Sequence, residues 1–317
     1  MSLTLDKNLK NNSCKIGENS LNAINKRAYV IALGYFDGVH IGHRSVIEHA
    51  KILKEQLNAK LVVWTFKGNL KSALGLDNEK YIYSYKEREK IYLSLGADEV
   101  FLAPVDKNFL SMTESEFLHY INEKYNICAY VCGDDYKFGK GGLGNVETLS
   151  EFAKQNSQIV KVCPPALNDG VRISTSYIKN LLINGEIEKA NELLGQDFFV
   201  KGIVEKGRGD GRKLGYPTAN LKIDVEKQMV KNGVYCGYCM VEQKKYPAII
   251  NCGNCPTFNV DKYSVEVCLL DFIGDLYGKS LTVYFTNRLR DIKKFDTIEE
   301  LKIQLAKDEK QTREIYD

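Results

Sequence analysis

The stretch Tyr29-Val-Ile-Ala-Leu-Gly-Tyr-Phe-Asp-Gly-Val-His-Ile-Gly-His43 decides the fold of the first half of this chain. Its first five residues are apolar and predict a buried strand, and a helical pattern follows over residues 44–57. Gly38 and Gly42, between the two, let the backbone approach a ligand closely. The first amide groups of a helix have no partner within it and favour negative charge. The stretch therefore predicts a phosphate-binding turn between a strand and a helix.

Two of the four histidines lie on this turn. His40 and His43 are three positions apart, so they can face the same ligand at the start of the helix. Imidazoles there can hydrogen-bond phosphate oxygens and stabilise charge that develops on them. Gly34 and Phe36 belong to the same turn and are expected to line the phosphate site. The alternative interpretation is an ordinary helix start with two surface histidines.

Composition and charge narrow the class of protein. A chain of 317 residues with 44% apolar residues predicts about two globular domains. The net charge of +3 arises from 44 basic and 41 acidic residues, and no basic stripe indicates a nucleic-acid partner. No apolar run is long enough for a bilayer, and residues 1–20 lack the apolar centre of a signal peptide. We expect a cytoplasmic protein without a membrane partner, with its nine cysteines reduced. Its oligomeric state stays open, and a homo-oligomer is compatible with the sequence.

Strand and helix patterns alternate through the first two-thirds of the chain, which predicts a doubly wound, Rossmann-like parallel sheet. In such a sheet, ligands bind at the carboxyl ends of the strands, where the histidine turn would lie. The expected strands are residues 29–33, 61–66, 99–103, 129–132 and 159–162, and the expected helices are 44–57, 84–95, one capped at Thr113, 176–184 and 187–194.

After Gly195 short strand patterns follow one another closely, with glycine-rich turns between them, which predicts an antiparallel β-barrel. A helix capped at Thr297 ends the chain. We therefore expect one domain over residues 15–195 and a second over residues 196–317. The expected barrel strands are residues 198–205, 233–241, 246–251, 264–270 and 280–285.

Two more segments of the first domain suit a phosphorylated ligand. A glycine-rich loop, residues 133–145, follows a strand, and its Asp135 can accept a hydrogen bond from a ribose or help to place a metal. A flexible acidic loop is the alternative. The segment Arg172-Ile-Ser-Thr-Ser176 precedes a helix, and Arg172 beside the hydroxyls of Thr175 and Ser176 makes a phosphate clamp. Helix capping alone is the alternative explanation of these hydroxyls.

The second domain has its own candidate site in residues 207–220. Gly207 and Gly211 belong to a basic, flexible loop whose backbone can line phosphates, and a plain hairpin loop is the alternative. The Thr218 hydroxyl and the Asn220 amide are oxygen ligands suited to Mg²⁺ bound with a nucleotide. Glu266 lies inside an apolar strand, where it is either on the exposed face or a positioned base.

Four of the cysteines have the spacing of a zinc ribbon, Cys236-x-x-Cys239 and Cys252-x-x-Cys255. Residues three apart on a strand point to opposite faces, and residues 234–241 alternate like a strand. We therefore expect buried thiols and no zinc.

Taken together, these motifs resemble those of the bacterial bifunctional riboflavin kinase/FAD synthetases, over nearly all of residues 25–317. Residues 251–258, 276–278 and 290–295 extend the resemblance. It implies a nucleotidyltransferase domain followed by a riboflavin-kinase Greek-key barrel. Riboflavin, FMN and ATP would be the substrates, and Mg²⁺ would enter with ATP.

The resemblance also implies a role for each candidate residue. In the first domain His40, His43, Arg172, Thr175 and Ser176 would hold ATP phosphates during adenylyl transfer to FMN, and Asp135 would lie on the substrate side. In the second domain Thr218 and Asn220 would hold Mg-nucleotide, Glu266 would be the base, and Arg290 would lie in a flap near the flavin.

The chain departs from the family pattern at two places. Phe66 is followed by Lys67-Gly-Asn-Leu70 where the family usually has a Pro-His-Pro loop, and Lys179 stands where the family usually has arginine. A riboflavin kinase with a degenerate synthetase domain is therefore an alternative. A flavin-binding regulatory protein without catalysis is another. A class I aminoacyl-tRNA synthetase, which shares His-x-Gly-His, ranks last because the sequence has no Lys-Met-Ser-Lys-Ser signature.

Overall fold

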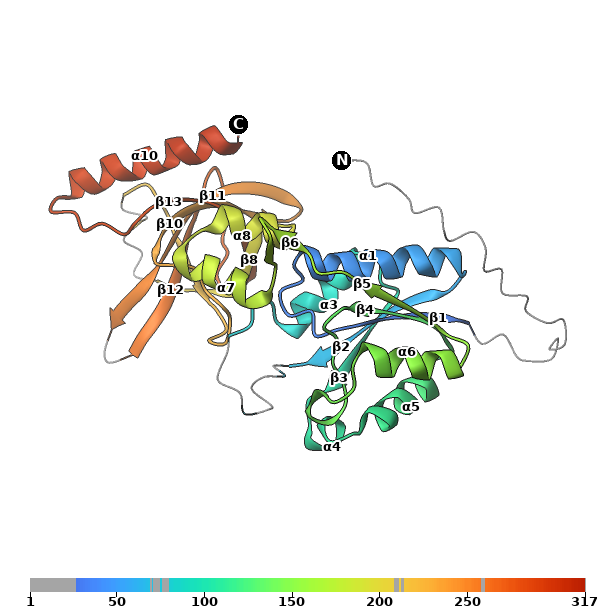
Figure 1. Cartoon of the computed structure of the whole chain (residues 1–317). Helices are drawn as coiled ribbons and strands as arrows, with labels where there is room; N and C mark the ends of the chain where they lie inside the picture. Colours follow the sequence, from blue (N-terminus) through green and yellow to red (C-terminus); the bar gives the residue numbers. More distant parts are fainter. Residues whose placement is uncertain are drawn as a thin grey trace.

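The computed structural model describes residues 27–68, 70, 75, 80–207, 211, 214–257 and 260–316. It consists of a sheet covered by helices, followed along the chain by a barrel that carries a long terminal helix (Figure 1). Across these ranges, no helix has both the length and the apolar character needed to cross a membrane.

The first part is a parallel sheet in the order β3-β2-β1-β4-β5, which confirms the predicted doubly wound class. Helices α1 (Ile41–Gln56) and α3 (Tyr85–Ser94) cover one face, and α5 (Glu114–Lys124) and α6 (Val146–Gln155) cover the other (Figure 1). The strands are β1 (Tyr29–Leu33), β2 (Lys60–Lys67), β3 (Glu99–Pro104), β4 (Ile127–Gly133) and β5 (Ile159–Cys163).

Short elements complete this part of the chain. Helix α4 (Lys107–Leu110) precedes α5, and a 3-10 turn, η2 (Lys140–Gly142), lies in the glycine-rich loop. Strands β6 (Leu167–Asn168) and β7 (Val171–Arg172) form a two-stranded hairpin beyond β5. The hairpin brings Arg172 back towards the end of β4, where it meets the loop that follows that strand.

The second part is a closed antiparallel barrel, in which the described strands are ordered β10-β11-β12-β9-β8-β13. This arrangement confirms the predicted barrel. Helix α10 (Ile298–Tyr316) packs across its outside against β11 (Figure 1). The strands are β8 (Phe198–Glu205), β9 (Ala219–Lys222), β10 (Gly233–Val241), β11 (Lys244–Thr257), β12 (Val260–Leu269) and β13 (Ser280–Arg290).

Strand β9 was not predicted from the sequence, which left residues 207–220 as a loop. It has only four residues, and it pairs with β8 on one side and with β12 on the other. Ala219 and Leu221 face the core, while Asn220 lies between them on the outward face. Strand β9, which was missed, therefore carries Asn220, a residue predicted to bind the nucleotide with its Mg²⁺.

Helices α7 (Thr175–Asn184) and α8 (Ile187–Leu194) lie between the sheet and the barrel (Figure 1). A single apolar core runs from the α1 face of the sheet through these helices into the barrel interior. Lys227 of the barrel is 3% exposed, and its Nζ lies 3.1 Å from the Glu87 carboxylate on α3. This buried ion pair joins the barrel to helix α3 of the first part, and removing either partner would leave a buried charge unpaired.

The cysteines of β10 point to opposite faces, as the strand pattern predicts. Cys239 packs in the apolar core, whereas Cys236 Sγ lies 3.5 Å from Thr286 Oγ1. Burial raises the pKa of Cys239 and of Cys252 to about 12. The side chain of Cys255 lies outside the described residues.

Candidate active sites

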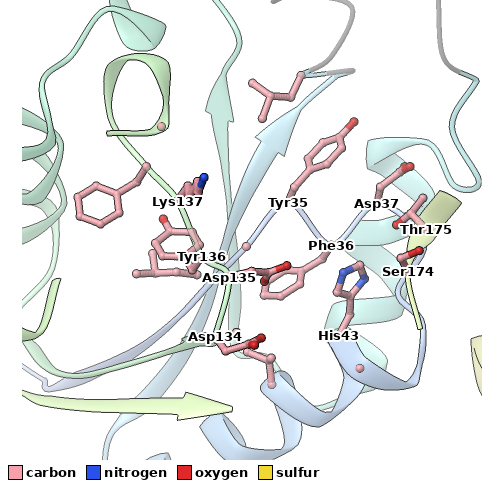
Figure 2. Close-up of a pocket in the computed structure, with 18 of the residues that line it drawn as sticks. Tyr35, Phe36, Asp37, His43, Asp134, Asp135, Tyr136, Lys137, Ser174 and Thr175 are labelled. Atoms are coloured by element: carbon pink, nitrogen blue, oxygen red, sulfur yellow. The ribbon is translucent and has the colours of Figure 1, made fainter. Parts of the chain in front are cut away.

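The larger candidate site is a cavity of about 830 Å³ at the carboxyl ends of β1, β2, β4 and β5 (Figure 2). It opens where a doubly wound sheet is expected to bind a ligand. Eight residues predicted from the sequence line it: Gly34, Phe36, His40, His43, Asp135, Arg172, Thr175 and Ser176.

Gly38 was predicted at this site but does not line the cavity. It is buried behind the turn, where a Cβ would lie 3.2 Å from Ile82 Cδ1 and 3.6 Å from Thr175 Oγ1. Its lack of a side chain lets the turn pack closely against Ile82. Gly38 therefore shapes the site from outside.

The turn between β1 and α1 has a strained backbone. Phe36 has a φ of 49° and Val39 a φ of 44°, which are left-handed values that residues other than glycine rarely adopt. The ring of Phe36 folds back over Gly34, where a Cβ would lie 2.4 Å from two ring atoms. Such conformations cost free energy and persist where the surrounding structure holds them.

The two histidines meet directly. The rings of His40 and His43 stack with centroids 3.6 Å apart and planes 22° apart. His40 is the N-cap of α1, because its Nδ1 accepts the backbone N–H of His43 at 3.3 Å. This bond leaves the proton of a neutral His40 on Nε2, where it can be donated to a ligand.

Burial keeps both rings neutral near pH 7. It lowers the pKa of His40 to about 4, with the positive charge of Arg172 as the second cause. Burial also lowers the pKa of His43 well below its ordinary value, with further contributions from His40 and Arg88. The rings can therefore act as uncharged hydrogen-bond donors.

Arg172 and Asp135 come together across the mouth of the cavity. The guanidinium of Arg172 binds both carboxylate oxygens of Asp134, at 3.2 and 2.8 Å, and lies 2.8 Å from Asp135 Oδ2. These side chains are substantially exposed, so the pairs contribute little to stability. A phosphate in the cavity would compete with the carboxylates for this guanidinium.

The three hydroxyl groups at the start of α7 have different roles. Ser174 Oγ accepts the backbone N–H of Tyr177 at 3.2 Å and so caps the helix. Thr175 and Ser176 lie in the first turn and line the cavity. Capping thus explains Ser174 but does not occupy the other two hydroxyls.

Several lining residues were not singled out from the sequence, among them Tyr35, Asp37 and Lys137 (Figure 2). Asp37 is buried, and its Oδ2 lies 3.6 Å from Nζ of Lys179, which is also buried. The position of Asp37 inside the histidine turn was a usable signal, because a carboxylate between two glycines suits a ligand site.

The second candidate site lies on the outward face of the barrel. The register of β9 with β12 places Asn220 directly opposite Glu266. Val265 and Val267 face the core, so Glu266 faces outward, half-buried, on the same side as Asn220. The exposed-face interpretation of Glu266 is thus correct for orientation, and the carboxylate still has a polar neighbour there.

The glycine Gly207 packs against Asn220, and Gly211 packs against Tyr216 and Thr218. A Cβ on Gly207 would lie 2.1 Å from Asn220 Nδ2, and one on Gly211 would lie 3.4 Å from Thr218 Oγ1. Thr218 also lines a small cavity of about 90 Å³ together with Pro217, Phe272 and Leu276. The structure therefore brings Gly207, Gly211, Thr218, Asn220 and Glu266 into one region.

Arg290 was predicted as a flavin contact, and in the structure it binds the terminal helix. Its guanidinium makes a bidentate pair with Asp308, at 3.0 Å from Nε and 2.7 Å from Nη2, and Asp308 is fully buried. A third bond, 3.1 Å long, joins Nη1 to the carbonyl of Asp291. The arginine thereby fixes the end of β13 to α10.

Comparison with known proteins matches both halves of the chain. A family model described as FAD synthetase matches residues 22–177, and one described as riboflavin kinase matches residues 194–316.

Curated relatives match over nearly the whole length. The bifunctional riboflavin kinase/FMN adenylyltransferase of Bacillus subtilis is 34% identical, over 89% of this chain and 90% of the relative. The proteins of the same name from Listeria monocytogenes and Escherichia coli K12 are 32% and 28% identical, over 90% and 95% of this chain and 92% and 96% of those relatives.

A crystal structure from Streptococcus pneumoniae, described as a macrolide-efflux protein, has a similar fold. Its TM-score is 0.84 with 32% identity, over 92% of this chain and 96% of that one. That description belongs to the other protein. The likeness supports the arrangement of sheet and barrel described above.

Proposed function

This chain belongs to the family of bifunctional riboflavin kinase/FMN adenylyltransferases, and on that premise we propose that it phosphorylates riboflavin to FMN and then adenylylates FMN to FAD. The observation that carries the proposal is that both family models match one chain, and that each matched region holds its own cluster of candidate residues. We assign the two reactions to domains over residues 15–195 and 196–317.

Adenylyl transfer takes place in the cavity at the end of the sheet. A phosphate oxygen of FMN attacks the α-phosphorus of ATP, and pyrophosphate leaves. His40 and His43 donate hydrogen bonds to the phosphate oxygens as neutral imidazoles. Arg172 exchanges its carboxylate partners for phosphate, and Thr175 and Ser176 donate from the start of α7.

The remaining first-domain assignments concern substrate orientation. Asp135, freed from Arg172 by the incoming phosphate, accepts a hydrogen bond from the substrate. Gly34 and Phe36 shape the wall of the cavity, and Gly38 lets the turn pack against Ile82 behind it. No covalent intermediate with the protein is required.

Phosphorylation of riboflavin takes place on the outward face of β9 and β12. Glu266 removes the proton of the riboflavin 5′-hydroxyl, which attacks the γ-phosphorus of ATP, and ADP leaves. Gly207 and Gly211 bring their backbone close to the nucleotide. Arg290 holds the flap end of β13 near the flavin through its pair with Asp308.

The residues of the kinase site fit Mg²⁺ carried by ATP. Thr218 and Asn220 offer a hydroxyl and an amide oxygen, the hard ligands that Mg²⁺ prefers. The absence of a side chain at Gly207 makes room for Asn220, since a Cβ there would lie 2.1 Å from Asn220 Nδ2. When bound, the cation neutralises charge on the phosphates.

A riboflavin kinase without synthetase activity is the second candidate function. It is favoured by one observation, the sequence Lys67-Gly-Asn-Leu70 that begins at the last residue of β2 and lacks the proline and histidine usual in the family. Phe66 and Leu70 both line the cavity, so the departure falls at the site itself.

One assay separates the two functions. The protein is incubated with riboflavin, ATP and Mg²⁺, and riboflavin, FMN and FAD are separated by chromatography over time. We expect FMN to appear first and FAD to follow. Accumulation of FMN without FAD, even when FMN and ATP are supplied in excess, would leave only the kinase.

A further inference from the structure

Helix α3 contributes two buried donors to the back of the first-domain cavity. We propose that Arg88 and Tyr92 are positioning residues for adenylyl transfer, which hold the histidine turn in its strained conformation from behind. The proposal rests on the adenylyltransferase function proposed above. It adds two residues that do not line the cavity and were not predicted from the sequence.

The contacts run to consecutive peptide groups of the turn. Arg88 is 2% exposed, and its Nη1 donates to the carbonyl of Tyr35 at 2.7 Å. Tyr92 is fully buried, and its hydroxyl donates to the carbonyl of Phe36 at 3.0 Å. The two side chains are four residues apart, so they leave the same face of the helix.

Arg88 also spans two strand ends. Its Nη2 donates to the carbonyl of Phe66 at 3.1 Å, at the end of β2, while Nη1 bonds Tyr35, two residues beyond the end of β1. Tyr35, Phe36 and Phe66 all line the cavity. One planar guanidinium therefore sets the spacing between two walls of the site.

These bonds act where the backbone needs support. Phe36 has its φ at 49°, and such strain persists only when neighbouring groups over-determine it. The Phe36 ring contacts both Tyr92 and His43, with centroids 6.2 and 5.3 Å away. A shift of this turn would therefore move the wall on which His43 rests.

Arg88 also places positive charge behind a site for anions. Among the described residues, its hydrogen-bond acceptors are the carbonyls of Tyr35 and Phe66 and the hydroxyl of Thr65, and all three are uncharged. Its charge reaches the site, since it contributes to the lowered pKa of His43. A buried cation is costly to keep without a counter-charge, and phosphate in the cavity would supply one.

The test compares Tyr92→Phe with a matched control, Tyr130→Phe. Tyr130 is also fully buried in the sheet, and its hydroxyl bonds Asn122 at 2.6 Å, away from the cavity. Each variant keeps its ring and loses one buried hydrogen bond. We expect Tyr92→Phe to lower the rate of FAD formation from FMN about 10-fold, the effect of losing one buried hydrogen bond that supports the turn. Tyr130→Phe should leave that rate unchanged, and both should make FMN at the wild-type rate.

A second measurement reports how stably the backbone of the histidine turn is held. Hydrogen exchange of the peptide spanning residues 33–43 should be faster in Tyr92→Phe than in Tyr130→Phe, with no substrate present. Arg88→Lys keeps the charge but cannot bridge both carbonyls, and it should exchange faster there too, with partial FAD formation.

The outcomes separate the two proposals. If the wild type makes no FAD, the adenylyltransferase function fails, and the exchange data alone decide the role of α3. Equal exchange and equal FAD formation in Tyr92→Phe and Tyr130→Phe would overturn the positioning role. Slower FAD formation that accompanies a loss of FMN formation would point to general unfolding and would also overturn it.

Discussion

At the scale of single residues, the account depends on two side chains that sit in separate sites. Glu266 faces outward beside Asn220 on the barrel, and His43 lies against His40 in the sheet cavity. A substitution at either residue leaves the side chains of the other site unchanged. Both therefore give sharp tests of function.

Replacing Glu266 by Gln keeps the shape of the side chain and removes the proposed base. Phosphorylation of riboflavin should fall by about 10²-fold or more. FAD formation from supplied FMN should persist, because that reaction takes place at the sheet. Steady-state rates of both reactions check this, and unchanged phosphorylation would make Glu266 an ordinary strand residue.

Replacing His43 by Ala removes one donor to the phosphates and leaves the amide groups of α1 in place. Loss of one preorganised donor typically costs about 3 kcal/mol, or roughly 10²-fold in rate. FAD formation should drop by about that factor, while FMN formation stays near the wild-type rate. An equal loss in both reactions would contradict separate sites.

The buried histidines also predict how stability depends on pH. The pKa of His40 is lowered from 6.5 to about 4, so between these values the unfolded chain binds more protons than the folded one. Stability is then complete above pH 6.5 and declines as the pH falls towards 4. From His40 alone we expect a loss of about 2 kcal/mol between pH 7 and pH 5.

Urea unfolding at the two pH values measures this loss. His40→Gln should show a smaller loss than the wild type, and the exposed His119→Gln serves as a control. Identical pH dependence in the wild type and His40→Gln would show that the ring of His40 is not held neutral.

At the scale of elements, local signals located most of the structure. Thr113 forms the predicted cap with Glu116 at the start of α5. Ser84 forms the same kind of reciprocal cap with Glu87 at the start of α3. Apolar runs located β1, β8 and β10 at their observed bounds. These signals succeed because the periodicity of a strand or a helix depends only on residues that are close together in the sequence.

The features that were missed depend on distant partners. Strand β9 is four residues long, and only its pairing with β8 and β12 identifies it as a strand. Helix α3 carries charge over Lys86-Glu-Arg-Glu-Lys90, which indicates a solvated face, yet Arg88 is buried against the carbonyls of Tyr35 and Phe66. Its local sequence holds no sign of those acceptors, because the fold brings them from elsewhere in the chain.

The two cysteines of strand β10 lead to a prediction about zinc binding. Cys236 and Cys239 lie on opposite faces of the strand, so the two thiols of this pair cannot converge on one ion. We expect the dialysed protein to contain no stoichiometric zinc by elemental analysis. About one zinc per chain would contradict this reading of the cysteines.

At the scale of the whole molecule, the sheet and the barrel are joined by a continuous apolar core and by specific polar contacts. The core is continuous through α7 and α8, and Tyr81 pairs with the barrel backbone through bonds to Glu226 and Gln228. Lys227 reaches Glu87, which neighbours Arg88 on α3. The barrel is thus built onto the helix that supports the sheet cavity, although each site keeps its own residues.

The central claim is that one chain holds two separable active sites that share only a diffusible product. Mixing the Glu266→Gln and His43→Ala variants, with riboflavin and ATP supplied, tests it most directly. Each variant alone should form FAD from riboflavin much more slowly than the wild type, because the impaired step then limits the overall rate. The equal mixture should recover much of the wild-type rate, because FMN made by one variant is adenylylated by the other. A mixture no more active than its components would contradict the account.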